Sequence, residues 1–360
     1  MKFVKNITMK KILSLLLLFT TLFAAGQVTK IDNKFAAIVN SYVKTKNFSG
    51  SVLVADNGKI IYNQNVGVAN RQDNTFITAS SKFKICSITK TFTATIILQL
   101  MEEGKIDLNK TIGTYFREYD GAARDRVTIH HLLTYSSGIE NVDQSSEAMY
   151  AMQQPIDTII KKYCSGKLVT EPGKQMNYKN ADYIILGKII EKITGKPYNT
   201  VLQERILQPL KMNSSGYLHN KDIVPGLVAT YLTDSSGKFY NDDPYWIENF
   251  YASGSMYATP QDLLKFDQAL FTNKLLKKET VQLMTTSYPE LWGVAYSFWV
   301  NEQNFDKVKT KVMDRRGSIG GGNTAWYHFI NENKTIIVFS NSNAADVKEI
   351  REKIAVALLN

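Results

Sequence analysis

Ser87 and Lys90 are the residues whose types and spacing most clearly permit chemistry. They stand three positions apart, just ahead of an apolar run over residues 94–101. On a helix, positions i and i+3 share a face, so the Lys90 amine would reach back toward the Ser87 hydroxyl. Serine is a poor nucleophile until a neighbouring base takes its proton, and a desolvated lysine can be that base. Taken alone, the pair is more typical of a helix N-cap serine and a solvated lysine.

Two later motifs extend this pair. Tyr178-Lys179-Asn180 follows in the middle of the chain, and a glycine-rich stretch over residues 317–322 precedes a strand-like run. Tyr178 is a second candidate base, provided that a cation such as Lys90 stabilises its phenolate. Asn180 can donate its amide to a substrate and accept from Lys90. The alternatives are an aromatic residue that uses its hydroxyl as a polar handle, and a turn asparagine.

In this order, the three motifs resemble the active-site motifs of the serine β-lactamase and penicillin-binding-protein family. The similarity is to the class C-like branch, which also contains esterases, D-aminopeptidases and D-alanyl-D-alanine carboxypeptidases. The resemblance runs from about Phe48 to Asn343. Connecting segments share it as well, at residues 128–138, 180–196, 210–212 and 258–263.

The resemblance implies a set of roles. Ser87 would be the acyl-accepting nucleophile, Lys90 and Tyr178 would manage its proton, and Asn180 would contact the substrate. The backbone amides of Ser87 and Gly321 would hold the oxyanion, and the glycines would let the strand approach the substrate. The implied activity is hydrolysis of a small ester, a D-residue peptide or a β-lactam through an acyl-enzyme. Peptidoglycan fragments are candidate partners.

The third motif departs from the family pattern, which has Lys-Thr-Gly or His-x-Gly. Aligning the glycines puts Ser318-Ile319-Gly320 there, so that a serine replaces the usual basic residue. Arg315 or Arg316, just upstream, could supply the cation. If neither does, neutral esters are expected to be better substrates than β-lactams, because β-lactams carry a carboxylate. A penicillin-recognising binding or sensor module with little or no activity is the alternative function.

The N-terminal residues are expected to lie outside the fold. Lys10 and Lys11 precede an apolar stretch over residues 12–25 that ends in small residues. This is the pattern of a secretory signal peptide, here residues 1–26, and the stretch is short for a transmembrane helix. The sequence therefore predicts a periplasmic or secreted protein without stable membrane insertion, whose hydrolase domain spans residues 27–360.

Composition and missing motifs argue against several other classes. The formal charge is +10, but the basic residues are scattered and no run is typical of a nucleic-acid-binding arm. No Cys-x-x-Cys or His-Glu-x-x-His occurs, so no metal site or cofactor is expected. The absence of Gly-x-Ser-x-Gly disfavours a Ser-His-Asp α/β-hydrolase. Cys86 and Cys164 are more typical of buried free thiols, although export would permit a disulfide. The oligomeric state is not indicated.

Hydrophobic patterns predict an α+β fold. A helix over residues 29–46 is followed by a hairpin whose strands, 51–55 and 59–62, flank Asp56-Asn57-Gly58. Mostly helical segments follow, from about residue 87 to 280, including a clear helix over 184–193. Strands return at 294–300, 324–329 and 335–340, and a helix closes the chain at 347–359. One mostly antiparallel sheet would then be built from both chain ends and flanked by helices. A helical lobe inserted between them is what the resemblance adds.

Overall fold

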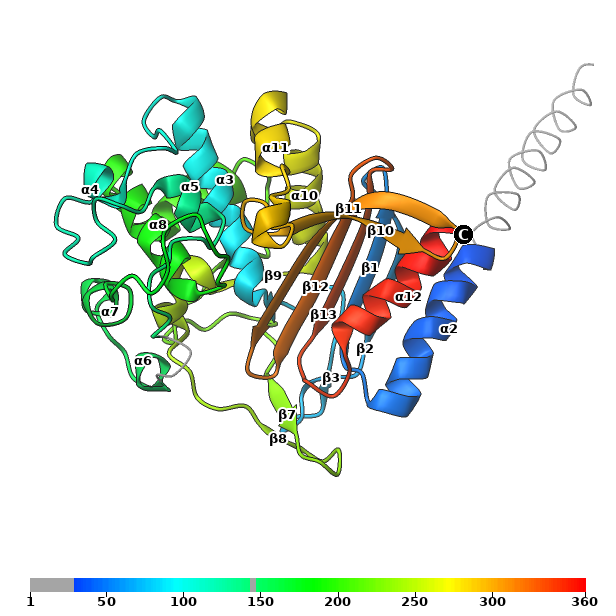
Figure 1. Ribbon diagram of the computed structural model, residues 1–360. Helices are drawn as coiled ribbons and strands as arrows, with labels where there is room; N and C mark the ends of the chain where they lie inside the picture. The colour runs from blue at the N-terminus through cyan, green and yellow to red at the C-terminus, as the bar shows by residue number, and fades with distance from the viewer. Residues whose placement is uncertain (1–28, 143–146) are drawn as a thin grey trace, which may run out of the picture.

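A six-stranded antiparallel sheet built from both ends of the chain lies at the centre of the molecule (Figure 1). The computed structural model describes residues 29–142 and 147–360, so the signal peptide expected over 1–26 lies outside the described residues. The strand order is β10-β11-β12-β13-β1-β2, and the N-terminal β1 pairs with the C-terminal β13. The predicted α+β class is confirmed. The strands are β1 (Gly50–Asp56), β2 (Lys59–Val66), β10 (Trp299–Phe305), β11 (Val308–Ile319), β12 (Gly322–Phe329) and β13 (Lys334–Ser340).

Helices cover both faces of the sheet. Successive strand side chains point to opposite faces, and apolar residues lie on both of them. In β1, Val52 and Val54 pack in one apolar cluster with residues of α2 (Thr29–Lys46) and α12 (Val347–Leu359). Leu53 belongs to the larger cluster on the other face, which includes residues of α3 (Thr89–Glu102) and α10 (Pro260–Phe271). Figure 1 shows α2 and α12 side by side on their face of the sheet.

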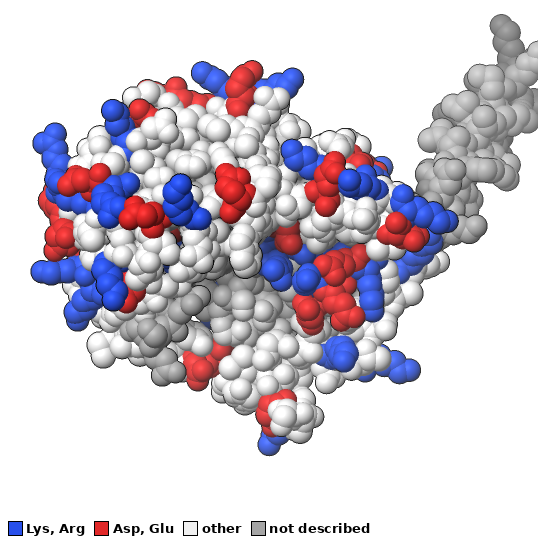
Figure 2. All heavy atoms as spheres, viewed as in Figure 1, with Lys and Arg blue, Asp and Glu red and all other residues white. Residues whose placement is uncertain are grey.

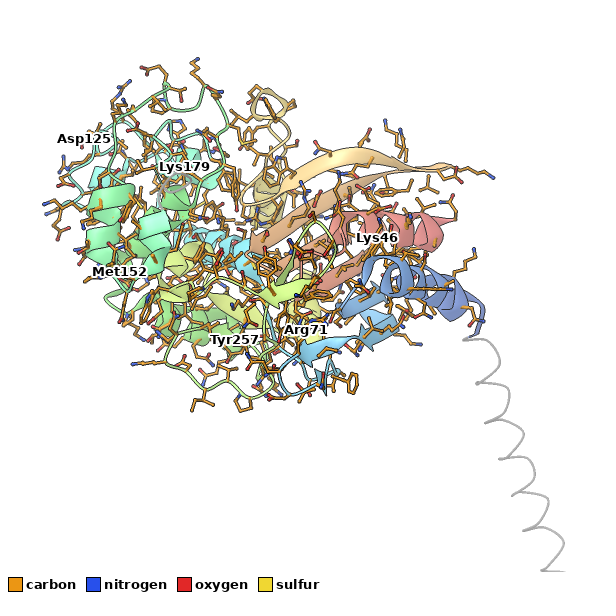
Figure 3. All side chains as sticks on the ribbon, turned by 90° about the horizontal axis from the view of Figure 1, so that it is seen from below. Lys46, Arg71, Asp125, Met152, Lys179 and Tyr257 are labelled. Atoms are coloured by element: carbon orange, nitrogen blue, oxygen red, sulfur yellow. The ribbon has the colours of Figure 1, made fainter. Side chains whose placement is uncertain are left out.

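The remaining helices gather beyond the opposite face and form the helical part of the molecule. Figure 3, viewed from below, shows Asp125, Met152 and Lys179 in this part, whereas Lys46 lies beside the sheet. The elements are η1 (Cys86–Ile88), α4 (Ile112–Tyr115), α5 (Ile129–Leu133), α6 (Glu147–Ala151), α7 (Ile156–Tyr163), α8 (Asn180–Thr194), α9 (Tyr198–Leu202), η3 (Gln203–Leu207), η4 (Ile247–Ser253), α11 (Lys278–Met284) and η5 (Pro289–Leu291).

Short strands complete the fold and link its two parts. They are β3 (Val68–Asn70), β4 (Thr75–Phe76), β5 (Phe83–Lys84), β6 (Gly216–Tyr217), β7 (Tyr231–Thr233), β8 (Phe239–Asn241) and β9 (Met256–Ala258). Within these, β5 pairs with β9 and leads directly into η1. The division of the chain into a signal peptide and one domain with a lobe over about 87–280 stays a prediction.

Turn and capping residues in the sequence correctly predicted several of the helices and strands named above. The hairpin turn places Asn57 and Gly58 at positive φ, and Gly195 ends α8 in the left-handed conformation. The helices α2 and α12 have the predicted bounds, whereas α8 begins at Asn180, ahead of the predicted start at residue 184.

Two strand assignments differ from the sequence prediction. The strand expected at 294–300 begins only at Trp299, and residues 289–291 form a helical turn. The longest strand, β11, is not predicted from the sequence, because it contains several charged residues and its alternation of buried side chains changes phase between Val312 and Met313. This omission matters, since β11 borders the candidate site.

Gly187 is expected to be required for the packing of α8 on η4. A Cβ atom added there would lie 2.4 Å from Ala252 Cβ and 2.6 Å from Tyr251 Cε1. Gly187→Ala should therefore destabilise the protein by about 1–3 kcal/mol through overpacking. Lys192→Ala, at an exposed position of the same helix, should change the free energy of unfolding by less than about 0.5 kcal/mol. Denaturant unfolding of both variants checks this, and equal stabilities would contradict it.

Candidate active site

Ser87 stands at a sharp turn that exposes its side chain beside a buried lysine. Cys86, just before it, has φ 50°, in the left-handed region that residues other than glycine rarely adopt. Lys90 lies in the first turn of α3 and is fully buried, with Nζ 3.3 Å from Ser87 Oγ. The predicted one-turn spacing therefore brings the hydroxyl and the amine together.

Lys90 is held by two further acceptors from distant parts of the chain. Its Nζ donates to Asn180 Oδ1 at 2.7 Å and to the Ser253 carbonyl at 2.9 Å. Asn180 begins α8, and its Nδ2 donates to Tyr150 Oη at 2.9 Å. Three acceptors match the three N–H donors of an ammonium group. Hydrogen bonds to three separate segments of the chain therefore fix the position of the Lys90 amine.

Tyr178 lies between Lys90 and Arg315. Lys90 Nζ is 5.0 Å from the centre of the Tyr178 ring, and Arg315 Nη2 donates to Tyr178 Oη at 3.2 Å. Burial alone would raise the pKa of Tyr178. The positive charges of Lys90 and Arg315, with hydrogen bonds to Lys90 and Ser87, outweigh that effect and lower the pKa to about 7. Tyr178 is thus suited to accept a proton near neutral pH.

Arg315 also contacts the backbone of the nucleophile. Its Nε donates to the Ser87 carbonyl at 2.9 Å, and Nη2 donates to the same oxygen. The guanidinium is 1% exposed and lies on β11, where Arg315 pairs with Trp326 of β12. The sequence left Arg315 and Arg316 as equal candidates for the missing cation. The structure distinguishes them, because Arg316 is exposed and Arg315 joins Ser87 to Tyr178.

The structure points to a different set of residues for the third motif than the sequence did. They lie three positions before Ser318-Ile319-Gly320. A Cβ atom at Gly317 would lie 2.8 Å from Ser87 N, so Gly317 is the glycine that packs against the nucleophile. Arg315-Arg316-Gly317 therefore takes the place of the basic-x-Gly motif. The sequence Arg315-Arg316-Gly317 could have identified this motif, because it already has a basic residue two positions before a glycine. The three glycines at 320–322 offered a competing alignment.

The other three predicted substrate-binding residues lie farther along β11 and its turn. Ser318 is exposed and lines the cavity beside Ser87. Gly320 and Gly321 lie beside Asp242, and the Gly321 N–H donates to Asp242 Oδ2 at 3.0 Å. That contact conflicts with the oxyanion role expected for Gly321. The pairing of β10 with β11 stops at Asp314, so the following residues leave a strand edge beside the cavity.

A cavity of about 360 Å³ opens next to Ser87. Figure 2 shows the surface hollowed between the helical part and the sheet, with both basic and acidic side chains on the sheet side. Basic, polar and aromatic side chains contribute to the wall. The lining residues are Ser87, Tyr178, Trp299, Arg315, Arg316, Gly317, Ser318, Asn323, Thr324, Asp346, Val347 and Lys348.

His130 and His131 make structural contacts, and both cysteines are buried. His130 Nδ1 pairs with Tyr296 Oη at 2.9 Å, and His131 caps α5 together with Thr128. Within residues 29–142 and 147–360, no three or more His, Cys, Asp and Glu side chains form a group that could hold a metal ion. Cys86 and Cys164 are buried free thiols, as expected. Burial raises the pKa of Cys86 to about 12, so its thiol does not compete with Ser87 as a nucleophile.

The sequence and the fold of this chain are similar to those of known proteins. Residues 35–360 match the family described as Beta-lactamase. The chain belongs to the Beta-lactamase family. The family predicted from the sequence motifs is therefore confirmed. The fold agrees as well: the octameric penicillin-binding protein homologue from Pyrococcus abyssi aligns with a TM-score of 0.78 and 27% identity, over 91% of this chain and 77% of that chain.

Relatives within the Beta-lactamase family have several names. The putative penicillin-binding protein PbpX of Bacillus subtilis is 28% identical over 69% of this chain and 61% of its own length. The teichoic acid D-alanine hydrolase of Staphylococcus aureus is 27% identical over 75% of this chain and 66% of its own length. The chain thus spans about two thirds of the length of these curated relatives. D-amino acid amidase from Ochrobactrum anthropi shares the fold, with a TM-score of 0.80 and 23% identity over 92% of this chain and 99% of that one.

Acylation of Ser87 is expected to be fast above pH about 7 and slow below it, because only the deprotonated Tyr178 can accept a proton. Arg315→Met removes a positive charge that lowers this pKa. The midpoint of the pH–rate profile should then move upward by about 1–3 pH units, whereas Arg315→Lys should move it less.

Arg316→Met is the matched control for Arg315→Met. It removes the same charge from the adjacent position, which is exposed. Pre-steady-state acylation by an activated ester, measured from pH 5 to 10, compares the variants. Equal midpoints for Arg315→Met and Arg316→Met would contradict the electrostatic role of Arg315.

Proposed function

We propose that the chain is an exported serine hydrolase that removes D-alanyl groups from esters through an acyl-enzyme on Ser87. The observation that carries the proposal is the Lys90–Tyr178–Arg315 arrangement around one accessible serine. Two buried cations flank a tyrosine whose pKa lies near neutrality. A structural serine has no need of such neighbours, whereas a nucleophile does.

Tyr178 is the proposed general base, and Lys90 supports it as a cation. In the acylation step, the Tyr178 phenolate takes the Ser87 hydroxyl proton while Ser87 Oγ bonds to the ester carbonyl carbon. The bond between that carbon and the leaving alcohol oxygen then breaks, and Tyr178 returns the proton to this oxygen. In deacylation, Tyr178 takes a proton from water, the water oxygen attacks the acyl carbon, and Ser87 leaves with the proton.

Backbone amides are the proposed donors to the oxyanion. The Ser87 N–H lies against Gly317 of β11. The unpaired edge of β11 after Asp314 presents further backbone groups at the same cavity. This replaces the Ser87–Gly321 pair expected from the sequence, since the Gly321 N–H is bonded to Asp242.

The substrate class rests on the relatives and on the cavity. The name of the 27% identical Staphylococcus aureus relative states hydrolysis of D-alanine from teichoic acid. A cavity of about 360 Å³ suits a small acyl group beside Ser87, with Arg316 and Lys348 in its wall. Penicillin-binding relatives make D-alanyl peptides the second candidate substrate.

The earlier reason to expect poor β-lactam turnover no longer applies. That reason assumed that Ser318 left the third motif without a cation. The Arg315 guanidinium, however, lies beside Tyr178. The same correction removes the main argument for an inactive penicillin-recognising module. The proposed preference for esters is therefore tested by comparing kcat/KM for D-alanyl esters with kcat/KM for nitrocefin.

Export is proposed from the N-terminal sequence alone. The apolar stretch over residues 12–25 and the preceding lysines favour a cleaved signal peptide. In the described part of the chain, no helix combines the length and the hydropathy needed to span a bilayer. N-terminal sequencing of protein recovered from the cell exterior or periplasm, expected to start near residue 27, tests this proposal.

A fluorophosphonate probe should add one covalent adduct to the wild-type protein and none to Ser87→Ala, as measured by intact mass. The kcat/KM for D-alanyl esters should exceed the values for L-alanyl esters and for nitrocefin. Acylation by penicillin without turnover of any ester would instead support a binding module. An adduct of unchanged yield on Ser87→Ala would contradict the assignment of the nucleophile.

Lys90 and Tyr178 should behave as one unit, because both act on the same proton. Lys90→Met and Tyr178→Phe should each slow acylation by about 10²–10⁴-fold. The double variant should be little slower than either single variant. Fully multiplicative effects in the double-mutant cycle would argue for independent roles.

A further inference from the structure

Asp242, directly after β8, contacts the turn that joins β11 to β12. Its Oδ2 accepts hydrogen bonds from the Gly321 N–H at 3.0 Å and from Thr230 Oγ1 at 2.7 Å. A Cβ atom added to Gly320 would lie 2.1 Å from Asp242 Oδ1, so the carboxylate lies directly against the backbone of the turn. One side chain therefore joins the β11–β12 turn to the residue that precedes β7.

Asp242 is also connected to the segment that carries Ser87. Lys84 ends β5, and its Nζ donates to Thr230 Oγ1 at 3.4 Å. Only Ile85 separates β5 from η1, which contains Ser87. Figure 1 shows β7 and β8 below the sheet. Through Thr230, Asp242 thus links the segment that precedes the nucleophile to the turn at the end of β11.

The position of this turn matters because β11 has a free edge beside Ser87. The pairing of β11 with β10 ends at Asp314, so the following residues of β11 pair only with β12. Gly317 lies in this part, and a Cβ atom there would be 2.8 Å from Ser87 N. Two residues separate Gly317 from the turn. A displacement of the turn would therefore move the strand edge away from the nucleophile.

The two cysteines can report such a displacement. Cys86 Sγ donates to the Lys84 carbonyl at 3.4 Å and to the Gly322 carbonyl at 3.5 Å, where the two linked segments meet. Cys164 lies at the end of α7, in the helical part, and both thiols are buried. Because Gly322 directly follows the turn, its release would expose Cys86 alone. Unfolding would expose both cysteines.

We propose that Asp242 is a positioning residue that holds the β11–β12 turn, and with it Gly317, against Ser87. Its carboxylate oxygen acts as the acceptor for the Gly321 N–H and the Thr230 hydroxyl. This contact holds the turn whether or not the chain is a hydrolase. The effect of Asp242 on acylation rests on the proposed hydrolase function.

Kinetics test the effect on acylation. Asp242→Ala should lower the plateau of the pH–rate profile for acylation by an activated ester by roughly 10–100-fold, since a small misplacement around the reacting atoms is costly. The midpoint should stay at about 7, because the two cations beside Tyr178 remain. Asp242→Asn keeps an oxygen that can accept both hydrogen bonds and should restore most of the rate. Asp243→Ala, which removes an exposed carboxylate from the next position, is the matched control.

Iodoacetamide labelling of the folded variants, measured by peptide mass spectrometry, tests the contact itself. Asp242→Ala should raise the rate of Cys86 labelling by about tenfold or more, whereas Cys164 should react as in the wild type. Asp243→Ala should match the wild type at both cysteines.

Several results would overturn the positioning role of Asp242. They are an unchanged acylation plateau or unchanged Cys86 labelling in Asp242→Ala, a shifted midpoint, equally increased labelling of both cysteines, or an equal loss of rate in Asp243→Ala. A wild-type chain that no ester acylates would refute the proposed hydrolase function. Selective labelling of Cys86 in Asp242→Ala would then still support the contact between Asp242 and the turn.

Discussion

The burial of the Lys90 ammonium is the constraint on which the rest of the site depends. A charged amine removed from water is tolerated only when its donors are satisfied. Here the three acceptors come from η1, α8 and η4, which are far apart in the sequence. The fold must bring these elements to one point, and the close contact of Gly187 with Ala252 and Tyr251 is part of how it does so.

A second buried cation completes the electrostatics from the opposite side. Arg315 reaches the site from β11, and it bonds to both the Ser87 carbonyl and the Tyr178 hydroxyl. Two positive charges on either side of one phenol favour its ionised form despite burial. The helical part supplies Lys90 and Tyr178, whereas the sheet supplies Arg315. The chemistry therefore exists only where the two parts meet.

The position of Arg315 in turn depends on the packing of the sheet edge. Its neighbour Asp314 is the last residue of β11 paired with β10, and its carboxylate receives two hydrogen bonds from the buried Arg351 of α12. The Arg351 guanidinium lies 3.4 Å from the centre of the Tyr327 ring. Because successive strand residues point to opposite faces, fixing Asp314 toward α12 directs Arg315 into the site.

The sequence by itself determined the local features of this protein. The i,i+3 spacing of Ser87 and Lys90, the Asn57-Gly58 turn, the bounds of α2 and α12 and the C-terminal end of α8 follow from short-range rules, and all were predictable. Only the tertiary structure decided that Arg315 rather than Ser318 faces Tyr178, and that the Gly321 N–H is bonded to Asp242. Strand register fixes which side chain meets the site, and that register is set by contacts with β12 and α12 rather than by the spacing of glycines.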